Sequence, residues 1–162
     1  MFELITALSQ KLLDRDMMLV TAESCTGGLI AKLMTDIAGS SAVFERAFVT
    51  YSNEAKTEMI GVDKKLIAEY GAVSEHVAKA MADGALKNSR AQIALACTGI
   101  AGPSGGSEEK PVGLVYIAVA LEGQDTAAFE HVFEGDREAV RMQTAELAMR
   151  YALAYLEESE EE

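Results

Sequence analysis

The residues best suited to chemistry lie in the sequence TAESCTGG, residues 21–28, which combines a hydroxyl, a thiol, a carboxylate and two glycines. An apolar run over residues 17–20 predicts a buried strand before it, and residues 29–34 have the spacing of a helix with one apolar face. The first N–H groups of a helix point outward and favour negative charge. This strand-to-helix turn predicts an active site with Ser24 as its nucleophile.

Ser24 has a second interpretation, because a serine in front of a helix is often only its N-cap. Thr26 competes for that role. Two glycines where a helix begins are costly for the helix, so Gly27 and Gly28 indicate that a ligand approaches the backbone there. The turn does not match the G-x-S-x-G sequence of the α/β-hydrolases.

A serine nucleophile needs a base, and the chain has two histidines. His76 falls in the first turn of a predicted helix and His131 in a predicted strand. Neither has a glycine-rich or strand-end context, so we expect packing or surface roles for both. A lysine whose pKa is lowered by burial or by nearby positive charge is the other option.

Lys56 is the lysine that fits this option, in the sequence YSNEAK at the end of a predicted strand. With Asn53 as the expected N-cap, Lys56 is the third residue of a helix, where its cation faces the positive end of the helix dipole. That position makes the amine easier to deprotonate. The alternatives are an ordinary solvated Lys56 and, for Tyr51 five residues earlier, an aromatic cap on the sheet edge.

A second glycine-rich turn, residues 98–106, follows the buried apolar run of residues 92–97. It matches neither the P-loop nor the dinucleotide fingerprint, although its backbone N–H groups suit an anion. Arg137, which opens the last predicted helix, is either a surface charge or an anion ligand. Cys25 lies beside a helix N-terminus, but without a matched histidine we expect it to pack. No grouping of ligand residues predicts a metal site.

The apolar periodicity predicts the elements that must position these residues. Parallel strands would bring Ser24, Tyr51 and Thr98 to one sheet edge, the usual place for sites in open α/β sheets. Helices before, between and after five strands predict an α/β sandwich with a mixed sheet. The predicted strands are 17–22, 43–51, 92–97, 112–121 and 127–133, and the predicted helices are 2–14, 29–37, 53–60, 63–70, 74–88 and 137–156.

The chain has 162 residues, 49% of them apolar, and this predicts one domain over residues 1–156. Residues 157–162 carry five glutamates and predict a solvated acidic tail. The net charge is −12, so the body remains acidic without this tail, which disfavours a broad nucleic-acid surface.

The cellular setting is predicted from what the sequence lacks. Its apolar runs fall short of the ~20 residues of a membrane span. The first ten residues lack the basic start of a signal peptide, and two cysteines make no disulfide framework. We therefore expect a cytoplasmic protein with no membrane partner.

Four sequences in this order and at these distances, TAESCTGG, YSNEAK, GAVSEHVAKAMA and CTGIAGPSGG, resemble the C-terminal domain family of the competence/damage-inducible protein CinA. The resemblance covers about residues 4–155, so we expect the chain to lack the N-terminal molybdopterin-binding-like domain of two-domain members. It implies a three-layer α/β/α sandwich with a mixed, mostly parallel five-stranded sheet. It also implies deamidation of nicotinamide mononucleotide to nicotinate mononucleotide and ammonia, in pyridine-nucleotide salvage, without a metal or cofactor.

The resemblance assigns roles by motif. It implies Ser24 as nucleophile and Lys56 as base, with Tyr51, Thr98 and Arg137 as further site residues. We expect backbone N–H groups around Cys25, Gly27 and Gly28 to hold the oxyanion. Our expected ligands for the 5′-phosphate are Arg137 and the glycine-rich loop, with Gly99, Gly102, Gly105 and Gly106.

Two other hypotheses stay open. The first is a nucleotide-binding or partner-docking module without turnover, linked to competence or the DNA damage response. The second is a cysteine hydrolase that uses Cys25. A homodimer is the default expectation for the assembly.

Overall fold

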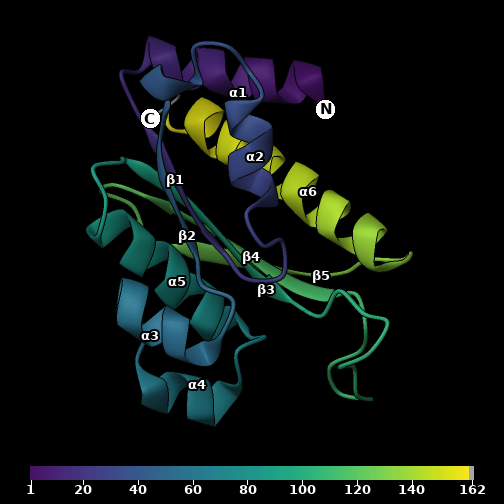
Figure 1. The fold of residues 1–162 in the computed structure, drawn as a ribbon. Coiled ribbons are helices and arrows are strands. Elements are labelled where there is room, and N and C mark those ends of the chain that lie inside the picture. Colours follow the sequence, from purple (N-terminus) through teal and green to yellow (C-terminus); the bar gives the residue numbers. More distant parts are fainter. Residues whose placement is uncertain (161–162) are drawn as a thin grey trace.

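The computed structural model describes residues 1–160 and contains a five-stranded sheet in the order β2-β1-β3-β4-β5 (Figure 1). β1 pairs in parallel with both β2 and β3, whereas β3 with β4 and β4 with β5 are antiparallel pairs. Only β4 is therefore reversed, and the predicted mixed, mostly parallel sheet is confirmed. The strands are β1 (Leu19–Glu23), β2 (Phe44–Val49), β3 (Ile93–Gly99), β4 (Leu114–Leu121) and β5 (Ala127–Val132).

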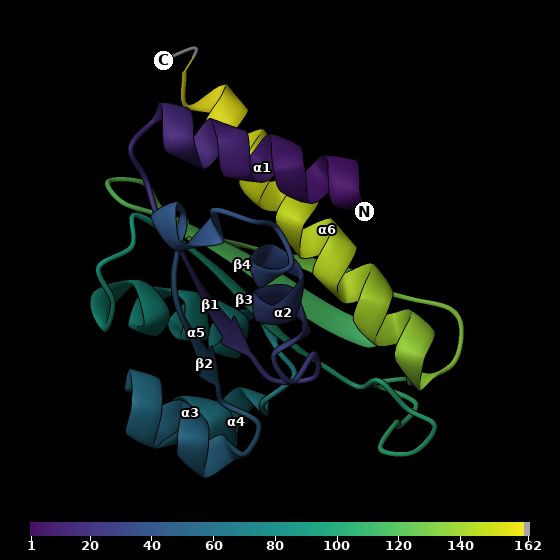
Figure 2. The ribbon, with the colours of Figure 1, turned by 45° about the horizontal axis from the view of Figure 1, so that its top comes forward.

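Helices cover both faces of the sheet, which confirms the predicted three-layer sandwich (Figures 1 and 2). One layer contains α1 (Phe2–Asp14), α2 (Leu29–Thr35) and α6 (Arg137–Glu158), with the short 3-10 helix η1 (Ser40–Ala42) beside β2. The other layer contains α3 (Asn53–Ile60), α4 (Lys64–Tyr70) and α5 (Glu75–Lys87).

The two faces of the sheet build different cores, because alternate residues of each strand point to opposite faces. Toward α1, α2 and α6 the central strand β3 presents Ile93, Leu95 and Cys97. Toward α5 it presents Ala94 and Ala96. The small side chains on the second face let α5 lie close to β3 and β4.

Gly84 makes this close packing possible in the α5 layer. A Cβ atom at this position would overlap the backbone carbonyl oxygen of Ile60 and would lie 3.1 Å from the Ile60 Cβ. A rotamer change cannot relieve an overlap with backbone, so α3 and α5 would have to separate.

We therefore expect Gly84→Ala to lower the free energy of unfolding. Overpacking typically costs about 1–3 kcal/mol, although helix propensity alone favours alanine by about 1 kcal/mol. Urea unfolding measures the difference, with Lys87→Ala on the exposed face of α5 as control. A Gly84→Ala protein as stable as the wild type would contradict this packing.

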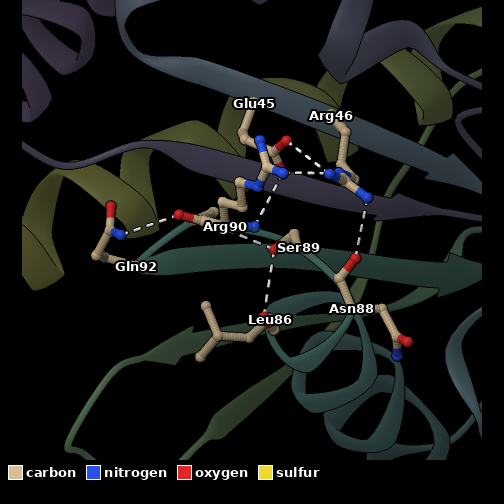
Figure 3. Close-up of polar contacts among 8 residues, drawn as sticks. Glu45, Arg46, Leu86, Asn88, Ser89, Arg90 and Gln92 are labelled. Atoms are coloured by element: carbon tan, nitrogen blue, oxygen red, sulfur yellow. Dashed lines mark hydrogen bonds and ion pairs between the residues drawn. The ribbon is translucent and has the colours of Figure 1, made fainter.

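A polar cluster ties the edge strand β2 to the connection between α5 and β3 (Figure 3). The Arg46 guanidinium donates to both carboxylate oxygens of Glu45, at 2.7 and 2.9 Å, and to the carbonyl of Asn88. The N–H of Arg90 donates to the Glu45 carboxylate at 3.1 Å. Charged residues on an open strand edge also discourage pairing with other chains.

The observed element boundaries differ from the predicted ones in a few places. β3 runs on to Gly99, so that Thr98 is a strand residue, and β1 begins at Leu19. α6 extends to Glu158, and the Glu160 carboxylate lies 2.9 Å from the Lys11 Nζ. These contacts involve part of the predicted acidic tail, whose last two residues lie outside the described part of the chain.

Candidate active site

A cavity of about 240 Å³ lies at the sheet edge where β1, β2 and β3 end. The parallel pairing of these strands brings Ser24, Tyr51 and Thr98 to it, as the sequence predicts. Its lining is Ser24, Cys25, Tyr51, Asn53, Lys56, Ala72, Val73, Thr98, Gly99, Ala101 and Arg137.

Lys56 and Ser24 are in direct contact in this cavity. The Lys56 Nζ lies 3.1 Å from the Ser24 Oγ, and the two residues are 1% and 8% exposed. The Nζ also donates to the carbonyls of Thr50 at 2.8 Å and Tyr51 at 3.2 Å. A neutral amine has two N–H groups and one lone pair, so these carbonyls can take both N–H groups and leave the lone pair for the Ser24 hydroxyl.

The burial of Lys56 excludes the interpretation as an ordinary solvated lysine. The expected cap was wrong, however. The Ser52 Oγ accepts from the N–H of Ala55 at 3.0 Å, so Ser52 rather than Asn53 is the N-cap and Lys56 is the fourth residue of α3. The side chain turns back from the helix toward the end of β2, where it meets the carbonyls of the two residues that follow the strand, Thr50 and Tyr51.

Burial lowers the pKa of Lys56 below its ordinary value, and the neighbouring Cys25, Cys97 and Glu54 offset part of this effect. The cavity lining contains no carboxylate that would restore the charged form through an ion pair. Burial therefore makes it easier for Lys56 to reach the neutral form that a general base requires.

Glu23 is a buried residue of the turn that the sequence argument left without a role. It is fully buried, and its Oε1 accepts from the Thr26 hydroxyl at 2.7 Å and from the N–H of Ile30 at 2.8 Å. Its Oε2 accepts from the N–H of Ala31 at 3.0 Å and from the Thr21 hydroxyl at 3.1 Å. A carboxylate that ends a buried strand just before a helix was the available signal, because the helix dipole favours it there.

This arrangement corrects two expectations for the turn. α2 begins only at Leu29, after Gly28, so neither Ser24 nor Thr26 caps it with its side chain. The N–H groups of Ile30 and Ala31 are used by the protein's own Glu23 and are not offered to a ligand.

The predicted glycines divide into two groups. Gly99 lines the cavity, and a Cβ there would lie 2.6 Å from the Val115 Cγ2. The others lie outside the lining. Gly27 and Gly28 have φ angles of +60° and +102°, so the shape of the turn itself requires glycine. The remaining three outside the lining are Gly102, Gly105 and Gly106.

Tyr51, Thr98 and Arg137 surround the cavity from three elements. The Arg137 guanidinium donates to the Gly102 carbonyl at 2.9 Å and to the Tyr51 hydroxyl at 3.4 Å. Tyr51 is 62% exposed, whereas Thr98 is buried and donates to the Ala72 carbonyl at 2.9 Å. Arg137 and Tyr51 therefore form the solvent side of the cavity, and Thr98 forms its inner wall.

Arg141 is a second site residue that the sequence argument missed. Its Nε donates to the Cys25 carbonyl at 3.1 Å and its Nη2 to the Thr26 carbonyl at 2.8 Å. The available signal was its position one helical turn after Arg137, which puts both arginines on one face of α6.

The cysteines and histidines have structural contacts. Cys97 is fully buried, with its Sγ 3.0 Å from the Thr26 Oγ1. The hydrogen bond to Cys25, together with burial, raises the pKa of Cys97 well above its ordinary value. His76 stacks on Tyr70, His131 lies 2.7 Å from the Tyr151 hydroxyl, and neither lines the cavity.

Residues 1–160 contain neither a grouping of metal ligands nor a helix that could span a membrane. No cluster of three or more His, Cys, Asp or Glu side chains there could hold a metal ion. Within the same residues no helix is both long and apolar enough to cross a membrane.

Comparison with known proteins extends over nearly the whole chain. Residues 2–156 match the CinA C-terminal domain. The nicotinamide-nucleotide amidohydrolase PncC of Shigella flexneri is 53% identical over 150 residues, which are 93% of this chain and 91% of that protein. The PncC protein of Escherichia coli K12 has the same identity and coverage.

A solved structure agrees with the fold. The competence/damage-inducible protein CihA from Agrobacterium tumefaciens superposes with a TM-score of 0.91 at 46% identity, and the match covers 94% of this chain and 93% of that one. The expected resemblance is confirmed: the chain belongs to the CinA C-terminal domain family.

Proposed function

We propose that this protein hydrolyses the carboxamide of nicotinamide mononucleotide to give nicotinate mononucleotide and ammonia, with Ser24 as nucleophile and Lys56 as base. The buried contact between the Lys56 Nζ and the Ser24 Oγ, at 3.1 Å, carries this proposal. The substrate follows from the similarity to the PncC proteins and from the charge of the cavity. In a chain with a net charge of −12, the cavity lining includes the guanidinium of Arg137 and no carboxylate.

The reaction proceeds through an ester of Ser24. Neutral Lys56 takes the Ser24 proton as the Oγ bonds to the carboxamide carbon, and the resulting ammonium then protonates the nitrogen that leaves as ammonia. Lys56 next takes a proton from a water molecule that attacks the ester. The bond between the carbon and the Oγ breaks, Ser24 regains a proton, and the nucleotide acid is released.

The N–H groups of Cys25 and Thr26 are our candidates for holding the oxyanion. They follow the nucleophile directly, and neither donates to another backbone or side-chain group within residues 1–160. The N–H of Gly27 is already used by the Ser24 carbonyl at 3.1 Å. Fixed N–H donors of this kind stabilise the charge that develops in the transition state.

Arg137 and Tyr51 are our candidates for the phosphate end of the substrate. Both are exposed at the solvent side of the cavity, and a guanidinium suits the bidentate recognition of phosphate. The proposed role of Thr98 is to bound the inner end of the cavity, where the pyridine amide must approach Ser24.

The lowered pKa of Lys56 gives a directional pH prediction. A base must be neutral, so kcat/KM should rise with pH as Lys56 loses its proton, with a midpoint below the value of about 10.4 for an unperturbed lysine. Initial rates of ammonia release between pH 6 and 10 measure this profile. A rate that falls over this range would contradict the role of a neutral Lys56.

A panel of pyridine amides tests the substrate. We expect ammonia release from nicotinamide mononucleotide to exceed that from nicotinamide riboside and nicotinamide, because these lack the phosphate that Arg137 would bind. Arg137→Met should remove most of this preference by raising KM for the mononucleotide. Equal activity on nicotinamide and its mononucleotide, or binding of the nucleotide without any acid product, would overturn the proposal.

A further inference from the structure

The position of the Ser24 hydroxyl depends on a turn that three other elements hold. The N–H of Ser24 donates to the Cys97 carbonyl at the end of β3, at 3.1 Å. The Ser24 carbonyl accepts from the N–H of Gly27, also at 3.1 Å, which closes residues 24–27 into a tight turn. Two charged side chains, Glu23 and Arg141, also hold this turn.

Glu23 holds the turn from the side of α2. Its carboxylate accepts four hydrogen bonds, two from the hydroxyls of Thr21 and Thr26 and two from the first N–H groups of α2. Because it is fully buried, these bonds are not weakened by solvent. Glu23 precedes Ser24, and Thr26 lies two residues after it. The Glu23 carboxylate therefore ties the chain on both sides of the nucleophile to the N-terminus of α2.

Arg141 holds the turn from the side of α6. Its Nε and Nη2 donate to the carbonyls of two consecutive residues, Cys25 and Thr26. The planar guanidinium presents its N–H groups in a fixed fork, so two nitrogens of one side chain each hold one of two adjacent peptide planes. These are the second and third peptide planes after the nucleophile, and the first of the two carries the N–H of Thr26.

We propose that Glu23 and Arg141 are positioning residues that hold the Ser24 turn against two different helices, α2 and α6, and keep its Oγ within reach of the Lys56 Nζ. Neither residue lines the cavity, so neither is placed to bind the substrate. A displacement of about 1 Å between reacting groups can cost about 100-fold in rate. Loss of either side chain should therefore lower kcat and leave KM nearly unchanged. The inference rests on the proposed function in that Ser24 is the nucleophile.

The test compares Arg141→Ala and Arg141→Lys with Arg150→Ala, a matched control on the same helix whose exposed guanidinium pairs with Glu146. We expect Arg141→Ala to lower kcat for nicotinamide mononucleotide by about 10- to 100-fold, with KM changed less than about 3-fold. Arg141→Lys can keep one of the two hydrogen bonds, so its kcat should lie between those of Arg141→Ala and the wild type. Millimolar guanidinium chloride should restore part of the activity of Arg141→Ala and have no such effect on the wild type.

A second readout does not depend on the substrate. Phenylmethylsulfonyl fluoride reacts with an activated serine. A bond forms between the serine Oγ and the sulfonyl sulfur of the reagent, and fluoride leaves. Mass spectrometry of the Ser24 peptide gives the rate of labelling, which Arg141→Ala and Glu23→Gln should slow by about the same factor as kcat. Circular dichroism verifies that each variant is folded.

The outcomes distinguish the positioning role of Arg141 from the proposed function. Labelling at the wild-type rate in folded Arg141→Ala or Arg141→Lys would overturn the positioning role, as would a rise in KM at constant kcat. If the wild type leaves nicotinamide mononucleotide intact while labelling still depends on Arg141, the positioning role stands and the proposed substrate is wrong.

Discussion

Replacing Ser24 by alanine should abolish ammonia release from nicotinamide mononucleotide, with a loss in kcat of at least about 10⁴-fold. The reason is that no other hydroxyl or thiol in the cavity is paired with a base as the Ser24 Oγ is with Lys56. Cys25 also lines the cavity, but no described hydrogen bond joins its sulfur to Lys56. Steady-state rates with purified protein measure the effect.

Calorimetry measures whether the inactive Ser24→Ala protein still binds the nucleotide. Ser24→Ala removes one oxygen atom at the wall of the cavity, so it should still bind the nucleotide with similar affinity. Ser41→Ala, in the exposed η1 segment, controls for the loss of a serine hydroxyl elsewhere. Full activity in Ser24→Ala combined with its loss in Cys25→Ser would identify a cysteine hydrolase instead.

Replacing Lys56 by methionine should lower kcat by about 10²- to 10⁴-fold, the usual contribution of a general base. Methionine keeps an unbranched side chain in the buried space, so the loss can be assigned to the amine rather than to a cavity. The rise of kcat/KM with pH should disappear in the same variant, because the group that titrates has been removed.

The Lys56 prediction has a matched control on the neighbouring helix. Lys65 in α4 is exposed, so Lys65→Met should keep both the rate and the pH profile of the wild type. A folded Lys56→Met protein that still shows the rise with pH would mean that another group is the base.

Local patterns were enough to predict an α/β sandwich with a mixed sheet and to single out Ser24 and Lys56 as candidates, whereas the three layers and the decision between the open interpretations of these two residues came from the resemblance to the CinA C-terminal domain family. Apolar runs and periodicity define the strands, and the parallel strands that follow from them bring the candidate residues to one edge. The burial of Lys56 was not predictable from position alone, since it depends on how the side chain turns back past Ser52 toward the end of β2.

The side-chain contacts of the turn at residues 24–27 could not be predicted either, because they depend on how distant parts of the chain pack. Arg141 reaches Cys25 and Thr26 across more than a hundred residues of sequence, and only the packing of α6 beside α2 shows it. Glu23 was visible as a carboxylate beside the nucleophile, but its hydrogen bonds to the N–H groups of Ile30 and Ala31 depend on how the turn folds back onto the start of α2. The approach of a ligand to Gly27 and Gly28 stays a prediction, and the positive φ angles that the turn needs at both positions were not part of it.

The central claim is that the protein turns over nicotinamide mononucleotide through an ester of Ser24, and one measurement addresses it most directly. Purified wild-type protein is incubated with the nucleotide in the presence of hydroxylamine, and ammonia, nicotinate mononucleotide and the corresponding hydroxamate are quantified. We predict ammonia in an amount equal to the acid and the hydroxamate together, with none of the three formed by Ser24→Ala. Recovery of the nucleotide unchanged, or continued turnover by Ser24→Ala, would contradict the claim.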